Sequence, residues 1–134
     1  MKKHKGQVIV EFALILPLLL LVLFGIIYSG MMFHDYITVT NIARASAREA
    51  AISGTSVAVG SRYGNIETSY SSQLDSLMTG FYVKDNDPIV VKQDTSESVE
   101  TTINMRLKVR GFFVDMILPQ TFGVRYYMRK EPTS

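Results

Sequence analysis

The 134-residue chain contains no cysteine, no tryptophan and only two histidines. Without cysteine it has no disulfide framework, no thiolate metal site and no cysteine nucleophile. Its 14 Lys and Arg residues against 12 Asp and Glu give a net charge of +2, too small to indicate a nucleic-acid partner. Neither His4 nor His34 is accompanied by the Ser and Asp, or by the Cys, that a nucleophilic catalytic site needs. We therefore expect no enzyme, no cofactor, no metal and no small-molecule substrate.

Charge is also missing from one long stretch of the chain. The 22 residues from Phe12 to Phe33 carry no charged side chain. As a helix rising 1.5 Å per residue, this run would be about 33 Å long, enough to cross a bilayer core. It is too long for the apolar part of a cleaved secretory signal. The sequence therefore predicts a permanent or specially processed membrane-spanning helix.

The flanking charges predict an orientation. Lys2, Lys3 and Lys5 precede the apolar run, and the positive-inside rule places them in the cytoplasm. Residues 35–134 would then lie across the membrane; they hold 14 − 3 = 11 basic and 12 − 1 = 11 acidic residues, as an ordinary polar domain does. We expect a protein with one span, a cytoplasmic N-terminus and an extracytoplasmic domain.

Glu11 stands at the cytoplasmic rim of the span, five residues after Gly6. A carboxylate entering hydrocarbon is costly and usually pairs with a cation or marks function. The residue alone leaves two interpretations open, because a carboxylate in the headgroup zone costs little and can simply end the span.

The surrounding residues resemble the prepilin processing signature of type IV filament systems. Gly6 is followed by Gln7, by Val10-Glu11-Phe12-Ala13, and by Leu16-Pro17 with a leucine run after it. Together with Phe24-Gly25, the Ala-Arg-Ala-x-Ala-Arg stretch at 43–48 and the Tyr-Tyr-Met-Arg-Lys-Glu ending, they resemble the TadE-like minor pseudopilins of tight-adherence (Flp) pili. The match is strongest over residues 5–51.

The resemblance implies a processing and assembly site. A prepilin peptidase would cleave between Gly6 and Gln7, so that residues 1–6 are a cytoplasmic leader and residues 7–34 a transmembrane and assembly helix. Glu11 would neutralise the new N-terminal amine of a neighbouring subunit, with Phe12 and Pro17 beside it in the assembly segment. The implied partners are the membrane, the peptidase, and other pilins or pseudopilins of the same system.

Periodicity predicts an α+β fold. The resemblance implies that this fold is pilin-like and that the protein is anchored in the bacterial inner membrane. One helix should run from Gln7 to Ser53, with Tyr36, Val39, Ala43, Ala47 and Ala50 on one stripe. A loop over 53–62 should lead to an amphipathic helix carrying Tyr63, Ile66, Tyr70, Leu74 and Leu77.

An antiparallel sheet of three or four strands should follow that helix. Short strands at 81–84 and 89–92 would be joined by a turn at Asp85–Pro88. Strict alternation over 99–110 predicts a half-buried strand, followed by a short helical turn at 112–118 and a last strand around 124–128.

Alternatives to the pseudopilin interpretation stay open. The chain could be a permanently anchored accessory binding module of an envelope complex, which predicts no cleavage, or the bulk subunit of the filament. Pro17 could serve helix melting during extraction from the bilayer, or only adjust helix shape. The sequence does not separate a TadE from a TadF role or a pilus base from a tip, and it does not say whether the pilus serves cell adhesion, DNA uptake or secretion.

Overall fold

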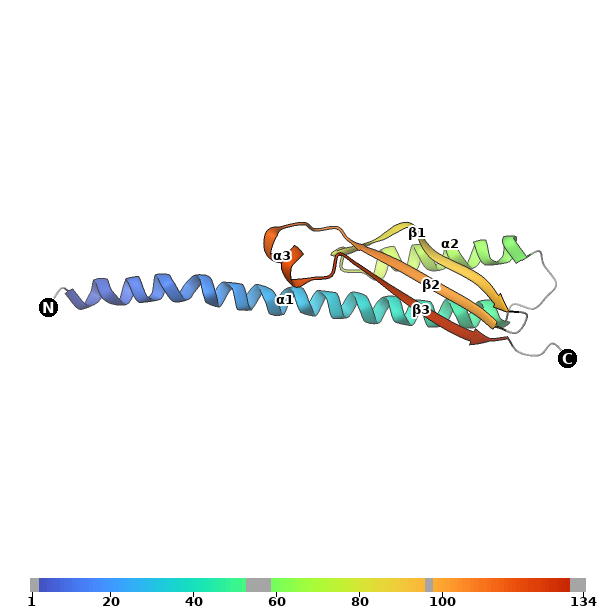
Figure 1. Ribbon diagram of the computed structural model, residues 1–134, viewed down its shortest axis with the longest axis horizontal. Helices are drawn as coiled ribbons and strands as arrows, with labels where there is room; N and C mark the ends of the chain where they lie inside the picture. Colours follow the sequence, from blue (N-terminus) through green and yellow to red (C-terminus); the bar gives the residue numbers. More distant parts are fainter. Residues whose placement is uncertain (1–2, 53–58, 96–97, 131–134) are drawn as a thin grey trace.

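The computed structural model describes residues 3–52, 59–95 and 98–130 (Figure 1). A helix α1 (Lys3–Ile52) is followed by α2 (Val59–Leu77), β1 (Tyr82–Thr95), β2 (Ser98–Leu107), a short α3 (Phe112–Ile117) and β3 (Thr121–Arg129). The α+β prediction is confirmed. The second half of α1 lies along the domain, and the first half extends beyond it as a bare rod (Figure 1).

The single long helix that the sequence predicts is confirmed, with 50 continuous residues. On its second half, Val39, Ala43, Ala47 and Ala50 are at most 1% exposed. The predicted stripe is thus the face that packs on the domain, where small side chains let the helix approach the sheet and α2 closely. Tyr36, at the start of the stripe, is instead 47% exposed and packs its ring against Phe122 at a centroid distance of 6.0 Å.

The second helix is also confirmed, but it begins earlier than predicted. Residues 59–62 were predicted as loop, and α2 already includes them; residues 53–58 of that loop lie outside the described part of the chain. Tyr63, Ile66 and Leu74 are buried as predicted. Leu77 is not part of the core, because it lies at the last turn and is 54% exposed.

Within the described residues, the sheet has three antiparallel strands in the order β1-β2-β3. Along β2 the inward side chains are all buried, while their neighbours face outward; the inward residues are Val99, Thr101, Ile103, Met105 and Leu107. Both long helices pack on this inner face, α1 against β2 and β3, and α2 against β1. The result is a two-layer domain with one solvent-facing sheet surface. The predicted strand alternation is confirmed, and the strand ends at Leu107 rather than 110.

The predicted turn at Asp85–Pro88 is wrong. Residues 82–95 form one strand that pairs with β2 on both sides of this segment, Lys84 with Met105 and Ile89 with Ile103. Four residues of β1 therefore stand opposite the single residue Asn104, which makes the segment an irregularity within a strand. The Asp, Asn and Pro residues are typical of a turn, yet β2 is long enough to pair with β1 both before and after this segment. Pro88, which has no N–H, interrupts the ladder at this irregularity.

The connection from α2 to β1 turns sharply at Gly80, whose φ of +82° is one that side-chain-bearing residues rarely adopt. The predicted short helix at 112–118 and the last strand are confirmed as α3 and β3. Val114 and Leu118 join the core from the α3 side. This places α3 at the end of the domain that faces the bare half of α1 (Figure 1).

Thr101 provides a test of the packing between α1 and the sheet. Its side chain is fully buried, and among the residues described its hydroxyl oxygen has no hydrogen-bond partner. Replacing an unsatisfied hydroxyl by a methyl of similar shape should stabilise the fold. We expect Thr101→Val to raise the free energy of unfolding by about 1 kcal/mol, measured by denaturant titration of the full chain in detergent. The outward-facing neighbour, as Thr102→Val, should give no gain; equal gains would mean that general β-propensity and not the buried hydroxyl is responsible.

The candidate assembly helix and its anchor

The first half of α1 leaves a continuous apolar surface uncovered. Every described side chain from Gly6 to Phe24 is exposed, and the large apolar ones among them are between 38% and 74% exposed. By length and composition this helix could cross a membrane, and none of its most apolar stretch is buried within the chain. Apolar surface of this extent on a single chain indicates contact with lipid or with other protein.

The residues predicted for processing and assembly lie together at the start of this surface. Gly6, Gln7 and Glu11 occupy adjacent turns of α1, and the Gln7 side-chain amide donates a 3.4 Å hydrogen bond to Glu11 Oε1. Phe12 follows and is 61% exposed. A β-carbon added at Gly6 would have no heavy atom within 4 Å. This end of the helix is therefore open to a second protein.

Pro17 lies inside α1 without ending it. Proline has no N–H, so the carbonyl of Ala13 loses the bond that a regular helix would give it. Pro17 also lines an apolar groove of about 780 Å³ between the first half of α1 and α3, together with Phe24, Tyr28 and Phe112. The structure therefore places Pro17 at the surface of α1, more than one helical turn away from Glu11.

The junction between the bare and the packed half of α1 is held by a buried carboxylate. Asp35 is fully buried and accepts two hydrogen bonds from Thr79, one from the backbone N–H at 3.0 Å and one from the hydroxyl at 2.8 Å. Thr79 follows α2 and precedes the turn at Gly80, so this contact ties α1 to the α2–β1 connection. His34 Nδ1 lies 3.5 Å from Asp35 Oδ1 at the surface.

Asp35 was not singled out by sequence reasoning. A single acid immediately after an apolar run is typical of the end of a span, and nothing in its neighbours distinguishes a buried anchor from an exposed end. Its partner, Thr79, is 44 residues away. Only the turn of the chain after α2 brings the two together.

The aromatic contacts next to Asp35 fix the domain against the emerging helix. Tyr28 packs on Phe81 at 5.2 Å between ring centroids, and Tyr82 meets Phe122 edge-on at 4.8 Å. The Tyr82 hydroxyl donates to the Pro119 carbonyl at 2.9 Å. Burial, with a smaller contribution from the negative charge of Asp35, raises the pKa of Tyr82 above its ordinary value of 10.0.

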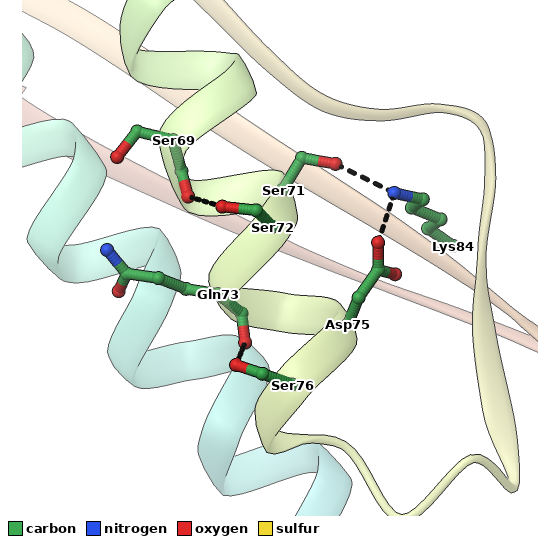
Figure 2. Close-up of polar contacts among 7 residues, drawn as sticks. All are labelled: Ser69, Ser71, Ser72, Gln73, Asp75, Ser76 and Lys84. Carbon is green, nitrogen blue, oxygen red and sulfur yellow. Dashed lines mark hydrogen bonds and ion pairs between the residues drawn. The ribbon is translucent and has the colours of Figure 1, made fainter.

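Polar contacts hold α2 to its neighbours on both sides. Lys84 of β1 reaches α2, where its ammonium donates to Asp75 Oδ2 at 2.6 Å and to Ser71 Oγ at 3.1 Å (Figure 2). On the side of α1, the Tyr70 hydroxyl donates to Glu49 Oε2 at 2.8 Å. Burial of the ring, this bond and the Glu49 charge together raise the pKa of Tyr70. Exposed pairs of this kind contribute little to stability, and we assign them to orientation of α2.

Removing the Asp35 carboxylate should weaken the junction. Asparagine has one side-chain acceptor oxygen and an amide nitrogen that only donates, so Asp35→Asn can accept one of the two Thr79 bonds and replaces the other charge-assisted bond by a weaker contact. We expect the free energy of unfolding to fall by about 1–3 kcal/mol in denaturant titration of the full chain in detergent. The matched control is His34→Gln on the exposed neighbour, which should change it by less than about 0.5 kcal/mol. A loss no larger than that of the control would show that Asp35 is not an anchor.

The raised pKa of Tyr82 predicts a loss of stability in alkali. The folded chain holds the phenol proton more tightly than the unfolded chain, whose value is 10.0. This contribution is complete below pH 10 and is lost as pH rises through the higher folded value. Tyr82→Phe should reduce the fall in unfolding free energy between pH 9 and about pH 11, while Tyr127→Phe on the exposed surface should leave it unchanged. An identical pH profile for wild type and Tyr82→Phe would contradict this assignment.

Comparison with known proteins bears directly on the first half of α1 and its continuation. The model of the family described as TadE-like protein matches residues 6–48. No curated protein and no solved structure matches the chain. The matched residues begin at Gly6 and include Glu11, Pro17 and Asp35. They also include Val39, Ala43 and Ala47 of the buried stripe on α1.

Proposed function

We propose that the chain, which matches the TadE-like family model over residues 6–48, is a minor pseudopilin of the Tad pilus. In this proposal a prepilin peptidase removes residues 1–6 on the cytoplasmic side. The mature helix is held by the membrane until it packs into the base or tip of the filament. The domain from residue 35 onward lies on the extracytoplasmic side, and the protein is structural rather than catalytic.

The observation that carries the proposal is the bare half of α1. A rigid helix projects from the domain with its apolar side chains uncovered and with Gly6, Gln7 and Glu11 at its accessible end. Such a helix can exchange one apolar environment, lipid, for another, a bundle of neighbouring helices. Burial of apolar area is similar in both, so the exchange has no large hydrophobic cost.

Processing would change the electrostatics of this helix. Removing Lys2, Lys3 and Lys5 changes the side-chain charge from +2 to 11 − 12 = −1. It also creates an α-amine at Gln7, within one helical turn of Glu11. In a low-dielectric surrounding a carboxylate and an ammonium are each costly alone and tolerable as a pair. Glu11 is thus suited to receive the N-terminal amine of a neighbouring subunit.

Cleavage is tested by intact mass of the protein extracted from membranes with and without the cognate peptidase. We expect the wild type to lose residues 1–6 only when the peptidase is present, and Gly6→Val to keep them. A side chain at Gly6 meets nothing in the structure, so a failure of Gly6→Val to be cut reflects recognition and not misfolding. Gly30→Val, equally unobstructed on the same helix, should be cut normally. Retention of residues 1–6 by the wild type with peptidase would favour a permanently anchored protein instead.

The role of Glu11 is tested separately from cleavage. Glu11→Gln removes the charge and keeps the shape, so processing should persist. Recovery of partner pilins with the tagged protein should fall about a hundredfold, since breaking a buried ion pair costs about 3 kcal/mol or more. Glu49→Gln is the matched control on the same helix, within the domain. Unchanged recovery with Glu11→Gln would leave Glu11 as a residue that only ends the span.

A further inference from the structure

We propose that α3 and the residues just before it form a second membrane contact, in which the domain inserts an apolar tip into the outer leaflet beside its own span. The tip consists of Val109, Phe112, Met116 and Ile117. This inference rests on the proposed function in one respect, namely that residues 12–33 cross the bilayer. It adds a lipid-binding surface on the domain, more than 70 residues after the span in the sequence.

The level of α3 along α1 carries the argument. Residues of α3 and of the first half of α1 line one groove: Phe112, Val114 and Ile117 with Pro17, Phe24 and Tyr28 among others. Tyr28 lies five residues before Phe33, the outer end of the apolar run, which is about 8 Å along a helix. Phe24 lies about 14 Å before it. A bilayer that covers the span therefore reaches α3, as the position of α3 over α1 in Figure 1 also shows.

Some side chains in and around α3 pack into the domain core, and others remain exposed at the level of Phe24 and Tyr28. Val114 and Leu118 are buried in the core. Phe112 is 80% exposed and Met116 73% exposed, with Ile117 and Val109 at about 40%. In water such a cluster of large apolar side chains would be unfavourable, whereas amphipathic helices at an interface bury an apolar face about 5–10 Å into the headgroup and acyl boundary. The level of Tyr28, about 8 Å inside the outer end of the apolar run, falls in this range, and the groove that α3 lines continues from there to the deeper levels of Phe24 and Pro17.

The polar groups of the tip fit the same surroundings. Asp115 is the acidic residue of α3, and the Gln120 side-chain amide donates to its Oδ1 at 2.9 Å, which lowers the cost of holding it near lipid. Lys108 and Arg110 flank Val109 and are exposed. Cations beside an inserted apolar tip attract the phosphates of anionic lipids. We therefore assign the tip to an anionic phospholipid surface.

The second contact would fix the orientation of the domain relative to the membrane. A single span leaves the domain free to rotate and tilt about the helix axis. A second contact on one side of the helix would fix which face of the domain points to the membrane and which faces a neighbouring subunit. Leaving the bilayer would then require withdrawal of both the span and the tip.

The absence of cysteine allows a direct test with single-cysteine variants of the full chain. Met116→Cys carries an environment-sensitive fluorophore in proteoliposomes of phosphatidylcholine and phosphatidylglycerol. Ile26→Cys reports on the span and Tyr127→Cys on the exposed sheet, and both positions are more than half exposed in the chain. Lipids with a spin label on the acyl chain then quench those fluorophores that lie in the bilayer.

We expect the Met116 label to be quenched at least half as strongly as the Ile26 label, and the Tyr127 label to be unaffected. Quenching at Ile26 with none at Met116 would overturn the membrane tip and leave the proposed span intact. No quenching at Ile26 would overturn both. A Met116 label with blue-shifted emission that depends on protein density and not on the quencher lipids would instead assign the tip to a second copy of the chain.

Discussion

Close contact between the second half of α1 and the sheet determines where the other elements lie. Ala43, Ala47 and Ala50 have side chains small enough for the helix axis to approach β2 and β3, and they are almost completely buried there. With α1 held in this way, α2 can pack beside it on the same face of the sheet. The long helix then has a fixed direction, so its first half must project from the domain.

One helix, α1, therefore carries two apolar surfaces, of which one is buried in the domain and the other is exposed. The small-residue stripe is covered by the chain itself, whereas the leucine-rich half is exposed within the part of the chain that the structure describes, as a surface that contacts lipid or other subunits would be. Asp35 marks the change between them. Its buried carboxylate, bonded to Thr79, fixes the point at which α1 leaves the domain and keeps the end of the domain close to the span.

Much of this arrangement could be predicted from the sequence, because it depends on local periodicity. The apolar run, the alanine stripe and the alternation in β2 each follow from spacing within one element. The resemblance to TadE-like proteins likewise depends on contiguous residues around Gly6, Glu11 and Pro17. The structure adds that this segment is exposed, with open space around Gly6.

The errors came from contacts between distant residues. Asp85 to Pro88 has the composition of a turn, yet pairing with β2 continues on both sides of it. Asp35 looked like the end of a span because Thr79 is 44 residues away. The level of α3 against Phe24 and Tyr28 depends on the whole path of the chain through the sheet, and no local pattern encodes it.

The central claim is that α1 is one uninterrupted helix. Its first half is stabilised by lipid or neighbouring subunits, and its second half is packed on the domain. Amide hydrogen exchange of the full chain in lipid nanodiscs, with increasing denaturant, tests it most directly. We expect slow exchange from the span through Ile52 without denaturant. Residues 36–52 should then lose protection together with β2, while the span keeps its protection. Fast exchange around residues 28–35 in the absence of denaturant, or loss of protection in the span together with the sheet, would contradict it.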